Sequence, residues 1–246
     1  MFGLFKSASV KPDLSFIGVD MHSHLLPGLD DGLKTIEETV EYVQHLYQMG
    51  YQKLICTPHI LSDVHPNSPS TILPRLNEVR AALAQKNIPV QIEAAAEYMI
   101  DHEFEQSIKR GDKLLTFGKN FILVEMSYLA PSPNFDQVIF ELRVLGLQPI
   151  VAHPERYNYY HHLFSQYERM RDMGCLLQVN LLSLSGYYGK PIKKIAEKLI
   201  AENMIDFIGT DMHHQNHLNA TQSFVSHKDF YKLLKNITFK NRLLLD

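Results

Sequence analysis

Short apolar runs alternate with longer segments of helical character along most of this 246-residue chain, and this alternation constrains the fold more than any other feature. Each run has the length of a buried strand and contains β-branched or aromatic residues. Repeated strand–helix units predict an α/β protein whose parallel strands are joined by right-handed crossovers. The predicted strands are Phe16–Met21, Leu54–Cys56, Val90–Ala96, Phe121–Val124, Pro149–Ala152, Leu176–Val179 and Ile205–Ile208.

Four of the intervening segments carry apolar residues at helical spacing. An open doubly wound sheet and a closed barrel of about seven strands both agree with this order, and the polar residues described below favour the barrel. We expect one domain over residues 1–246, with an N-terminal extension at 1–15 and a C-terminal helical segment at 229–246. The predicted helices are Thr35–Met49, Pro74–Gln85, Phe135–Leu145 and Ile192–Ile200.

The charge balance argues against a protein that captures nucleic acid electrostatically. The chain has 24 Lys and Arg against 27 Asp and Glu, a formal net charge of -3, whereas such a protein usually has a basic surplus. Its 2 Cys cannot form a disulfide framework. No apolar run approaches the ~18 residues that span a bilayer, and the N-terminus lacks a signal-peptide pattern. We therefore expect a cytoplasmic protein without membrane insertion.

Histidine or acidic residues follow six of the seven predicted strands. In parallel barrels the active site lies at the carboxyl ends of the strands, so these side chains should meet at one rim. Residues two apart in an extended segment share a face, so His22 and His24 can reach a single metal ion. The other histidines and acidic residues that follow predicted strands are Asp30, Asp31, His59, Glu97, Glu125, His153, Asp211 and His213.

Each of these residues has a simpler interpretation when it is taken alone. A single histidine near a strand end is usually structural, and the pattern of His22 and His24 is short. Glu97 and Glu125 follow very apolar strands, where an unpaired carboxylate is costly to bury, and either a metal ion or Arg156 would remove that cost. The joint occurrence of all these residues at strand ends predicts a polynuclear metal site.

The chain resembles the polymerase-and-histidinol-phosphatase (PHP) superfamily in an ordered set of motifs. Within it, the chain is most similar to the bacterial manganese-dependent tyrosine-protein phosphatases that regulate capsule and exopolysaccharide synthesis. The resemblance implies a distorted (β/α)7 TIM-like barrel of the PHP type with a trinuclear metal centre. The motifs are His22-Ser-His24, Asp30-Asp-Gly32, Thr57-Pro-His59, Ala96-Glu97, Val124-Glu125, His153-Pro-Glu-Arg156 and Asp211-Met-His213.

The same resemblance implies the ligands of each metal. Asp31 is preferred to Asp30 because its offset from His22 matches the family pattern. Arg156 matches the family's phosphate-binding arginine, whereas a further arginine that these phosphatases can carry is absent from His214–Thr221. The implied sets are His22, His24, Glu97 and Asp211 for the first metal, Glu97, Glu125 and His153 for the second, and Asp31, His59 and His213 for the third.

The residue types indicate the metals and the reaction. Five histidines and four carboxylates suit divalent ions such as Mn, Fe or Zn. The resemblance implies three such ions, Mn2+ first, with Fe or Zn as alternatives. Three such ions carry +6 against −4 from the carboxylates, and the remaining positive charge attracts a phosphate monoester. A water that bridges two ions becomes hydroxide near neutrality and attacks phosphorus, while Arg156 and the metals hold the other oxygens. A tyrosine phenol, with a pKa of ~10, leaves more readily than an alkyl alcohol.

Cysteine-dependent phosphatase chemistry is excluded, because neither Cys56 nor Cys175 begins a C-x5-R loop. Other functions stay open. A related phosphoesterase would act on histidinol phosphate or nucleotides, and an amidohydrolase often uses a carboxylated Lys where this chain has Glu125. A metal-binding scaffold would capture phosphotyrosine without hydrolysing it. The partner that the resemblance implies is a phosphotyrosine protein, such as a bacterial tyrosine kinase, and an oligomer is compatible with it.

Overall fold

The computed structural model describes residues 10–234 and 237–245. Strands and helices alternate along the chain, and every pair of neighbouring strands in its sheets is parallel, which confirms the predicted α/β class. The strands are β1 (Val19–Asp20), β2 (Lys53–Cys56), β3 (His59–Ile60), β4 (Gln91–Ala94), β5 (Glu97–Met99), β6 (Phe121–Glu125), β7 (Gln148–Ala152), β8 (Leu176–Asn180) and β9 (Phe207–Gly209).

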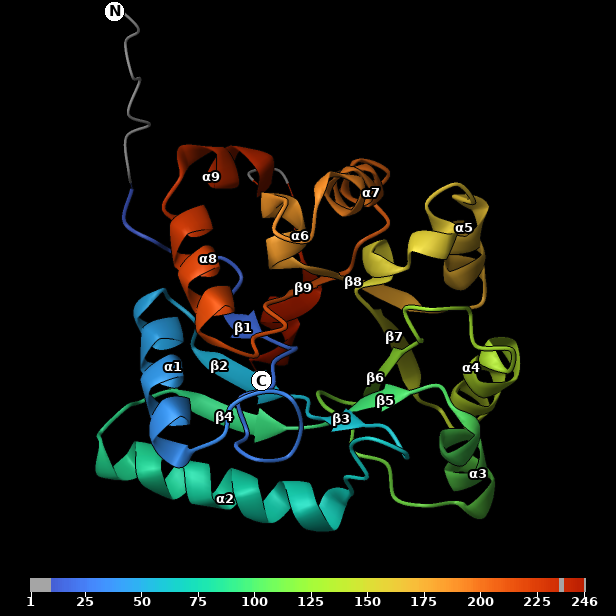
Figure 1. Ribbon diagram of the computed structural model, residues 1–246, viewed down its shortest axis with the longest axis horizontal. Helices are drawn as coiled ribbons and strands as arrows, with labels where there is room; N and C mark the ends of the chain where they lie inside the picture. The colour runs from blue at the N-terminus through green and yellow to red at the C-terminus, as the bar shows by residue number, and fades with distance from the viewer. Residues whose placement is uncertain (1–9, 235–236, 246) are drawn as a thin grey trace, which may run out of the picture.

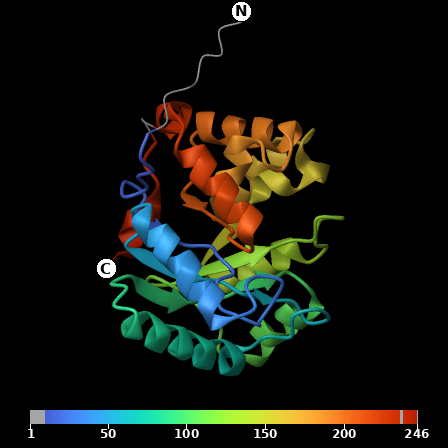
Figure 2. The same cartoon turned by 60° about the vertical axis from the view of Figure 1, so that its left-hand side comes forward.

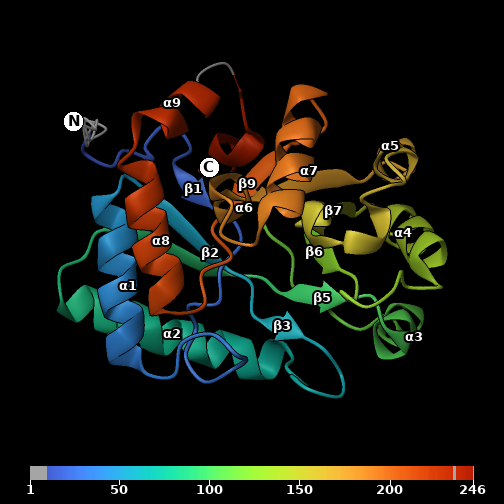
Figure 3. The same cartoon turned by 45° about the horizontal axis from the view of Figure 1, so that its top comes forward.

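Helices surround the strands in Figures 1 and 3. The α-helices are α1 (Ile36–Gln48), α2 (Pro69–Gln85), α3 (His102–Arg110), α4 (Phe135–Val144), α5 (Ser165–Asp172), α6 (Leu181–Ser185), α7 (Lys190–Ala201), α8 (Gln215–Val225) and α9 (Lys228–Leu234). Figure 2 shows α2 on one side of the strands and α8 on the other. Helices α1 and α8 lie side by side, and Tyr42 donates a hydrogen bond to Gln215 across them (3.3 Å). None of these helices is long and apolar enough to cross a membrane.

The strands belong to two sheets that continue into one another. One sheet has the order β1-β2-β4 and the other the order β3-β5-β6-β7-β8-β9. The second and third predicted strands correspond to β2 and β4, and each is followed by a further short strand that was not predicted. A break at residues 57–58 separates β2 from β3, and a break at residues 95–96 separates β4 from β5. Backbone hydrogen bonds cross both breaks, from Ala95 N–H to Cys56 O (2.9 Å) and from Glu97 N–H to Pro58 O (3.1 Å). The break at Pro58 has a physical cause, since proline has no backbone N–H to donate.

The segments that follow β1 and β9 run beside each other. Ser23 and Met212 form a parallel bridge, Asp211 N–H donates to His22 O (2.8 Å), and His24 N–H donates to Met212 O (2.9 Å). Before this point, Asn241 joins the same two strands. Its amide nitrogen donates to Val19 O (2.8 Å) and to Ile208 O (2.7 Å). The first and last strands of the chain are therefore neighbours.

Two predicted boundaries were wrong. Phe16 lies in a turn and is 40% exposed, so only the end of the predicted run Phe16–Met21 is strand. Helix α2 begins five residues before the predicted start and contains Pro74 in its interior. The helix begins at Pro69. Proline is favourable at this position because the backbone N–H groups of the first helical turn have no partner within the helix, so the N–H that proline lacks is not needed. Buried side chains at Ile72, Leu76, Val79 and Leu83 then hold the helix against the strands despite the proline.

The structure describes only part of each predicted terminal segment. Residues 1–9 of the predicted N-terminal extension lie outside the described residues, as do 235–236 and 246 of the C-terminal segment. The described part of that C-terminal segment contains most of α9 and a 3-10 helix at Lys240–Leu244. Asn241, which joins β1 and β9, belongs to this 3-10 helix, so the C-terminal segment packs beneath the first and last strands.

Candidate metal centre

Two fully buried histidines follow strand β1, and each has one ring nitrogen held by a neighbour. His22 Nδ1 lies 2.8 Å from Gln178 Oε1, and His24 Nδ1 lies 2.7 Å from Asp30 Oδ2. The two Nε2 atoms lie 3.3 Å apart. An acceptor on Nδ1 leaves the lone pair of Nε2 for a metal ion, which is the usual arrangement of metal-binding histidines.

Glu97, at the start of β5, lies at the centre of the cluster and is completely buried. Its Oε2 lies 3.2 Å from His22 Nε2 and 3.4 Å from His24 Nε2. The same oxygen lies 3.1 Å from His59 Nδ1, and Oε1 lies 3.0 Å from His153 Nε2. One carboxylate from β5 is thus within reach of four imidazoles that come from the ends of three other strands.

Glu125, the last residue of β6, extends the cluster on the same side as His59. Its Oε1 lies 2.9 Å from His59 Nδ1, and its Oε2 lies 4.0 Å from His153 Nε2. Burial and the nearby His24 oppose protonation of His59, yet the carboxylates of Glu97 and Glu125 raise its pKa to about 9. Protons therefore balance the clustered carboxylates in the protein without metal, and a cation in the same place would replace them.

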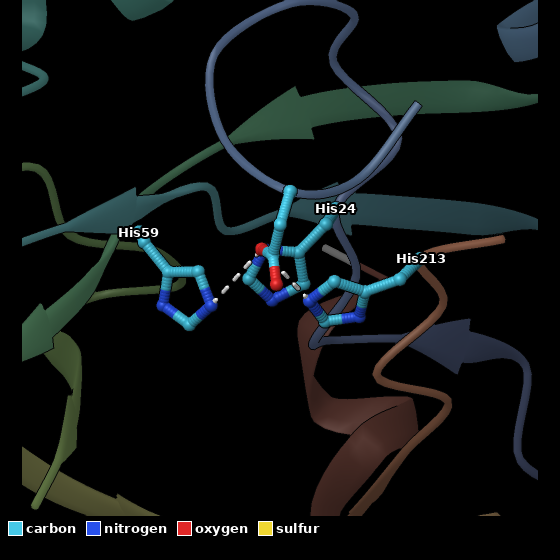
Figure 4. A group of neighbouring side chains, drawn as sticks. His24, His59 and His213 are labelled. Carbon is cyan, nitrogen blue, oxygen red and sulfur yellow. Dashed lines mark ion pairs between the residues drawn. The ribbon is translucent and has the colours of Figure 1, made fainter. Parts of the chain in front are cut away.

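A third part of the cluster lies at the mouth of the site (Figure 4). Asp31 Oδ1 lies 3.7 Å from His59 Nε2 and 3.5 Å from His213 Nε2, and the His24 and His213 rings stack with 3.9 Å between centroids. Asp30 behaves differently. Its carboxylate is buried and accepts hydrogen bonds from the backbone N–H groups of Gly32 (2.9 Å) and His59 (3.0 Å) as well as from His24. Asp31, rather than Asp30, therefore presents an oxygen to the Nε2 atoms of His59 and His213.

Asp211 uses its two carboxylate oxygens differently. Its Oδ1 faces the cluster, 3.5 Å from His22 Nε2, 3.4 Å from His24 Nε2 and 3.3 Å from His213 Nδ1. Its Oδ2 accepts a hydrogen bond from Arg156 Nη1 (2.9 Å). Burial opposes ionisation, but His22 and His213 hold the pKa of Asp211 well below its usual range.

The backbone is strained at two of these residues. His153 has a φ of 33° and Asp211 a φ of 50°. Non-glycine residues rarely adopt positive φ values, and such strain persists only where the surrounding structure holds it. Both residues follow a strand directly or within two positions, and the strained turn directs each side chain back over the cluster. This strain is a further indication that the cluster is functional.

Arg156 lies beside the cluster with its guanidinium between two aromatic rings. The guanidinium carbon is 4.6 Å from the centre of the Tyr128 ring and 4.4 Å from that of Tyr188. Both rings favour a cation over their faces. The N–H groups of a guanidinium lie in its plane; one of them points to Asp211, and Arg156 also lines the cavity described next.

A cavity of about 560 Å³ opens over the cluster. Its floor contains candidate ligands from the ends of several strands, and its walls carry aromatic and polar side chains. Asp31 at its mouth is 63% exposed, whereas Glu97 and the histidines after β1 are buried beneath it. The residues that line the cavity include Tyr128, Arg156, Tyr188, Asp211 and His213.

The residues present fit divalent metal ions. The buried atoms His59 Nδ1, Glu97 Oε2 and His153 Nδ1 have no hydrogen-bond partner, although the first two lie only 3.1 Å apart. Unpaired buried polar atoms are costly, and a cation shared by the converging atoms would remove that cost at His59 and Glu97. Ligand atoms lie within 4.8 Å of one another in four overlapping groups, which are His24–Asp31–His59–His213, His22–His24–Asp211, His22–Glu97–His153 and His59–Glu97–Glu125.

The structure brings all nine predicted ligands and Arg156 to one cavity and its floor, and it adds two histidines that the sequence analysis did not identify. The His65 ring stacks on His59 with 5.7 Å between centroids. His217 is buried, and its Nδ1 lies 3.0 Å from Asp211 O and accepts from His213 N–H (3.3 Å). Its position four residues after His213, at the start of a helix, was a usable signal, whereas nothing in the sequence pointed to His65.

Comparison with known proteins gives one family. The sequence matches the family described as "Capsular polysaccharide synthesis, CpsB/CapC" over residues 18–244. It is 26% identical over 230 residues to the tyrosine-protein phosphatase YwqE of Bacillus subtilis (strain 168), covering 92% of this chain and 91% of the relative. It is 28% identical over 195 residues to the putative tyrosine-protein phosphatase CapC of Staphylococcus aureus, covering 79% of this chain and 76% of the relative.

Solved structures agree with this result. The crystal structures of YwqE from Bacillus subtilis and CpsB from Streptococcus pneumoniae are described as those of metal-dependent tyrosine phosphatases. The match has a TM-score of 0.78 at 26% identity and covers 92% of this chain and 94% of that chain. A lactonase from Listeria monocytogenes, at 12% identity and a TM-score of 0.56, shares the fold alone. The match over nearly the whole sequence shows that this chain belongs to the CpsB/CapC family of capsular polysaccharide synthesis.

Proposed function

We propose that this protein is a metal-dependent protein-tyrosine phosphatase that acts in capsule or exopolysaccharide synthesis. The observation that carries the proposal is the convergence of five histidines and four carboxylates on one cavity, next to an arginine held between two rings. Membership of the CpsB/CapC family and the phosphatase names of the relatives support it.

The proposed cofactor is a set of three divalent ions, Mn2+ first, with Fe or Zn as alternatives, because nitrogen and carboxylate donors without thiolates suit these metals. Glu97 would bridge two of the ions, which its contacts with four imidazoles support. The proposed ligands are His22, His24, Glu97 and Asp211 for the first ion, Glu97, Glu125 and His153 for the second, and Asp31, His59 and His213 for the third.

The chain's own residues would bind and orient the phosphate. Bound divalent ions supply Lewis acidity and lower the pKa of water, so that a nucleophile exists near neutral pH. Arg156 lines the cavity and would give two parallel N–H bonds to phosphate oxygens from the edge that does not contact Asp211. Asp30 and Asp211 hold His24 and Arg156 in place through hydrogen bonds of 2.7 and 2.9 Å.

A phenolic leaving group suits this site. Its pKa of ~10 makes protonation less necessary than for an alkyl alcohol. His217, which lies near the cluster, is buried, and burial lowers its pKa to about 4, so it is a poor proton donor near neutral pH. We therefore propose phosphotyrosine in a protein as the substrate, with a bacterial tyrosine kinase as the candidate protein.

We also propose that residues 1–246 form one domain built on a closed, distorted (β/α)7 barrel. Counting β2 with β3 and β4 with β5 as broken strands gives seven strands. Closure is supported by the bonds that join the segments after β1 and β9, including the bridge between Ser23 and Met212. A barrel would place all the candidate ligands at its carboxyl rim.

The test compares phosphotyrosyl peptide, histidinol phosphate and a nucleotide as substrates of the purified protein, with Mn2+ and after removal of metal by a chelator. We expect hydrolysis of the peptide to exceed that of the other two and to disappear with the chelator. Preference for histidinol phosphate or nucleotide would indicate another phosphoesterase of the superfamily. Binding of the peptide without release of phosphate would indicate a scaffold, and either result would overturn the proposal.

A further inference from the structure

Strand β8 lacks His, Asp and Glu, yet two of its side chains reach the candidate metal centre. Gln178 and Asn180 are fully buried and, being two residues apart on a strand, share one face. Gln178 is the partner of His22, and Asn180 donates from its amide nitrogen to Asp211 Oδ2 (2.7 Å). The strand that supplies no ligand therefore contacts two proposed ligands, which come from the first and last strands.

The four side chains form one continuous series of hydrogen bonds. His22 Nδ1 lies 2.8 Å from Gln178 Oε1, and Gln178 Nε2 donates to Asn180 Oδ1 (2.8 Å). Asn180 Nδ2 then donates to Asp211 Oδ2. Each amide thus accepts through its oxygen and donates through its nitrogen, so the series runs in one direction from histidine to carboxylate.

The ionised carboxylate determines this direction. Ionised Asp211 can only accept, so Asn180 must present its NH2 group to it and its oxygen to Gln178. Gln178 must then present its own NH2 group to Asn180 and its oxygen to His22. An oxygen on this side requires a proton on Nδ1 of His22, and a neutral ring protonated there has its lone pair on Nε2, the atom that faces Glu97.

Strand β9 packs closely against this series of side chains. Strand β9 passes so close that a Cβ on Gly209 would lie 2.7 Å from His22 Cβ and 3.0 Å from Gln178 Nε2. Those separations are shorter than van der Waals contact, so only glycine fits between the two side chains. Glycine at this position therefore lets the backbone of β9 lie directly against His22 and Gln178.

We propose that Gln178 and Asn180 are positioning residues that transmit the charge of Asp211 to His22 and so select the metal-binding tautomer of that histidine. The inference rests on the proposed function, because it takes His22 and Asp211 as ligands of the first metal. Partners of this kind typically change metal affinity by ~10- to 100-fold when they are removed. The two amides should act as a unit, since either break leaves the tautomer of His22 unselected.

The experiment measures Mn2+ binding to the full chain by competition with a fluorescent chelator. The variants are Gln178→Met, Asn180→Leu and the double variant, which keep approximate shape but remove the hydrogen bonds. We expect each single variant to weaken at least one Mn2+ by ~10-fold or more. We expect the double variant to bind Mn2+ no more weakly than the worse of the two single variants, because the effects of substitutions at coupled residues do not add. Asn241→Leu, at a buried amide that joins the strands away from the site, should lower the melting temperature without changing Mn2+ affinity.

Several outcomes would overturn the inference. Mn2+ affinity within twofold of the parent in both single variants would do so, as would losses that multiply in the double variant or an equal loss in Asn241→Leu. Should the β8 variants fail to fold, the 15N spectrum of histidines in the Zn2+-loaded parent decides, because a proton on Nε2 of His22 contradicts the proposal. If the parent hydrolyses phosphotyrosyl peptide and binds Mn2+ while the Gln178 and Asn180 variants bind Mn2+ equally well, the inference is wrong but the proposed function stands. If the parent protein neither hydrolyses the peptide nor binds Mn2+, both the proposed function and this inference are wrong.

Discussion

Replacement of Arg156 by alanine tests the proposed phosphate site most directly. One guanidinium nitrogen donates a hydrogen bond to Asp211 (2.9 Å), and the guanidinium carbon lies within 4.6 Å of the ring centres of Tyr128 and Tyr188. The free edge can then form two hydrogen bonds to phosphate oxygens. Bonds to charged groups contribute about 1.5–3 kcal/mol each, and the lower value applies because the side chain is 22% exposed and water can partly replace it.

The expected loss is therefore about 3 kcal/mol of transition-state stabilisation, which corresponds to a fall of roughly 160-fold in kcat/KM at 1.36 kcal/mol per tenfold. Metal content should change little. Asp211 keeps its hydrogen bond from Asn180 when the arginine is removed, so its carboxylate stays oriented. Arg156→Lys should fall between the parent and the alanine variant, because lysine keeps the charge but not the two-pronged geometry.

The assay is steady-state hydrolysis of a phosphotyrosyl peptide at saturating Mn2+, with bound metal measured on the same preparations. Arg75→Ala, at an exposed arginine of α2 whose side chain pairs with Glu78, is the matched control and should behave as the parent. Parallel losses of metal and of activity in Arg156→Ala would show that the arginine acts through Asp211 and not on phosphate. Activity within threefold of the parent would refute the assignment outright.

Three further predictions follow from the site and the core. Replacing His22 and His24 together by alanine should remove turnover and bound metal while the circular dichroism spectrum is kept; unchanged turnover would exclude the first-metal assignment, and His102→Ala is the control. Tyr188→Leu should weaken inhibition by inorganic phosphate ~5-fold through loss of a cation–π contact, whereas Tyr188→Phe should match the parent; equal effects would exclude the ring as the cause. Iodoacetamide near neutral pH should not inactivate the enzyme, because burial raises the pKa of each cysteine thiol to about 12; rapid inactivation would contradict this.

Much of the fold could be predicted from the sequence because buried strands and helices require apolar residues at regular positions. Strands covered on both faces are continuously apolar, so the runs at 121–124 and 149–152 were found almost to the residue. The short strand after the break at Pro58 and the early start of α2 were missed for different reasons. The first depends on a missing N–H at one residue within a paired strand, and the second on tertiary packing that offsets an interior proline.

The sequence by itself determined which side chains would meet. A ligand at the end of a parallel strand must lie at the common rim, whatever the detailed packing, so Glu97, Glu125 and the histidines could be grouped from their phase alone. Only the tertiary structure decided how those groups are oriented. His22 and Gln178 are 156 residues apart, and Arg156 lies between rings from two separate loops. Such contacts depend on strand register and on rotamers in a packed interior, which no local pattern of residues records.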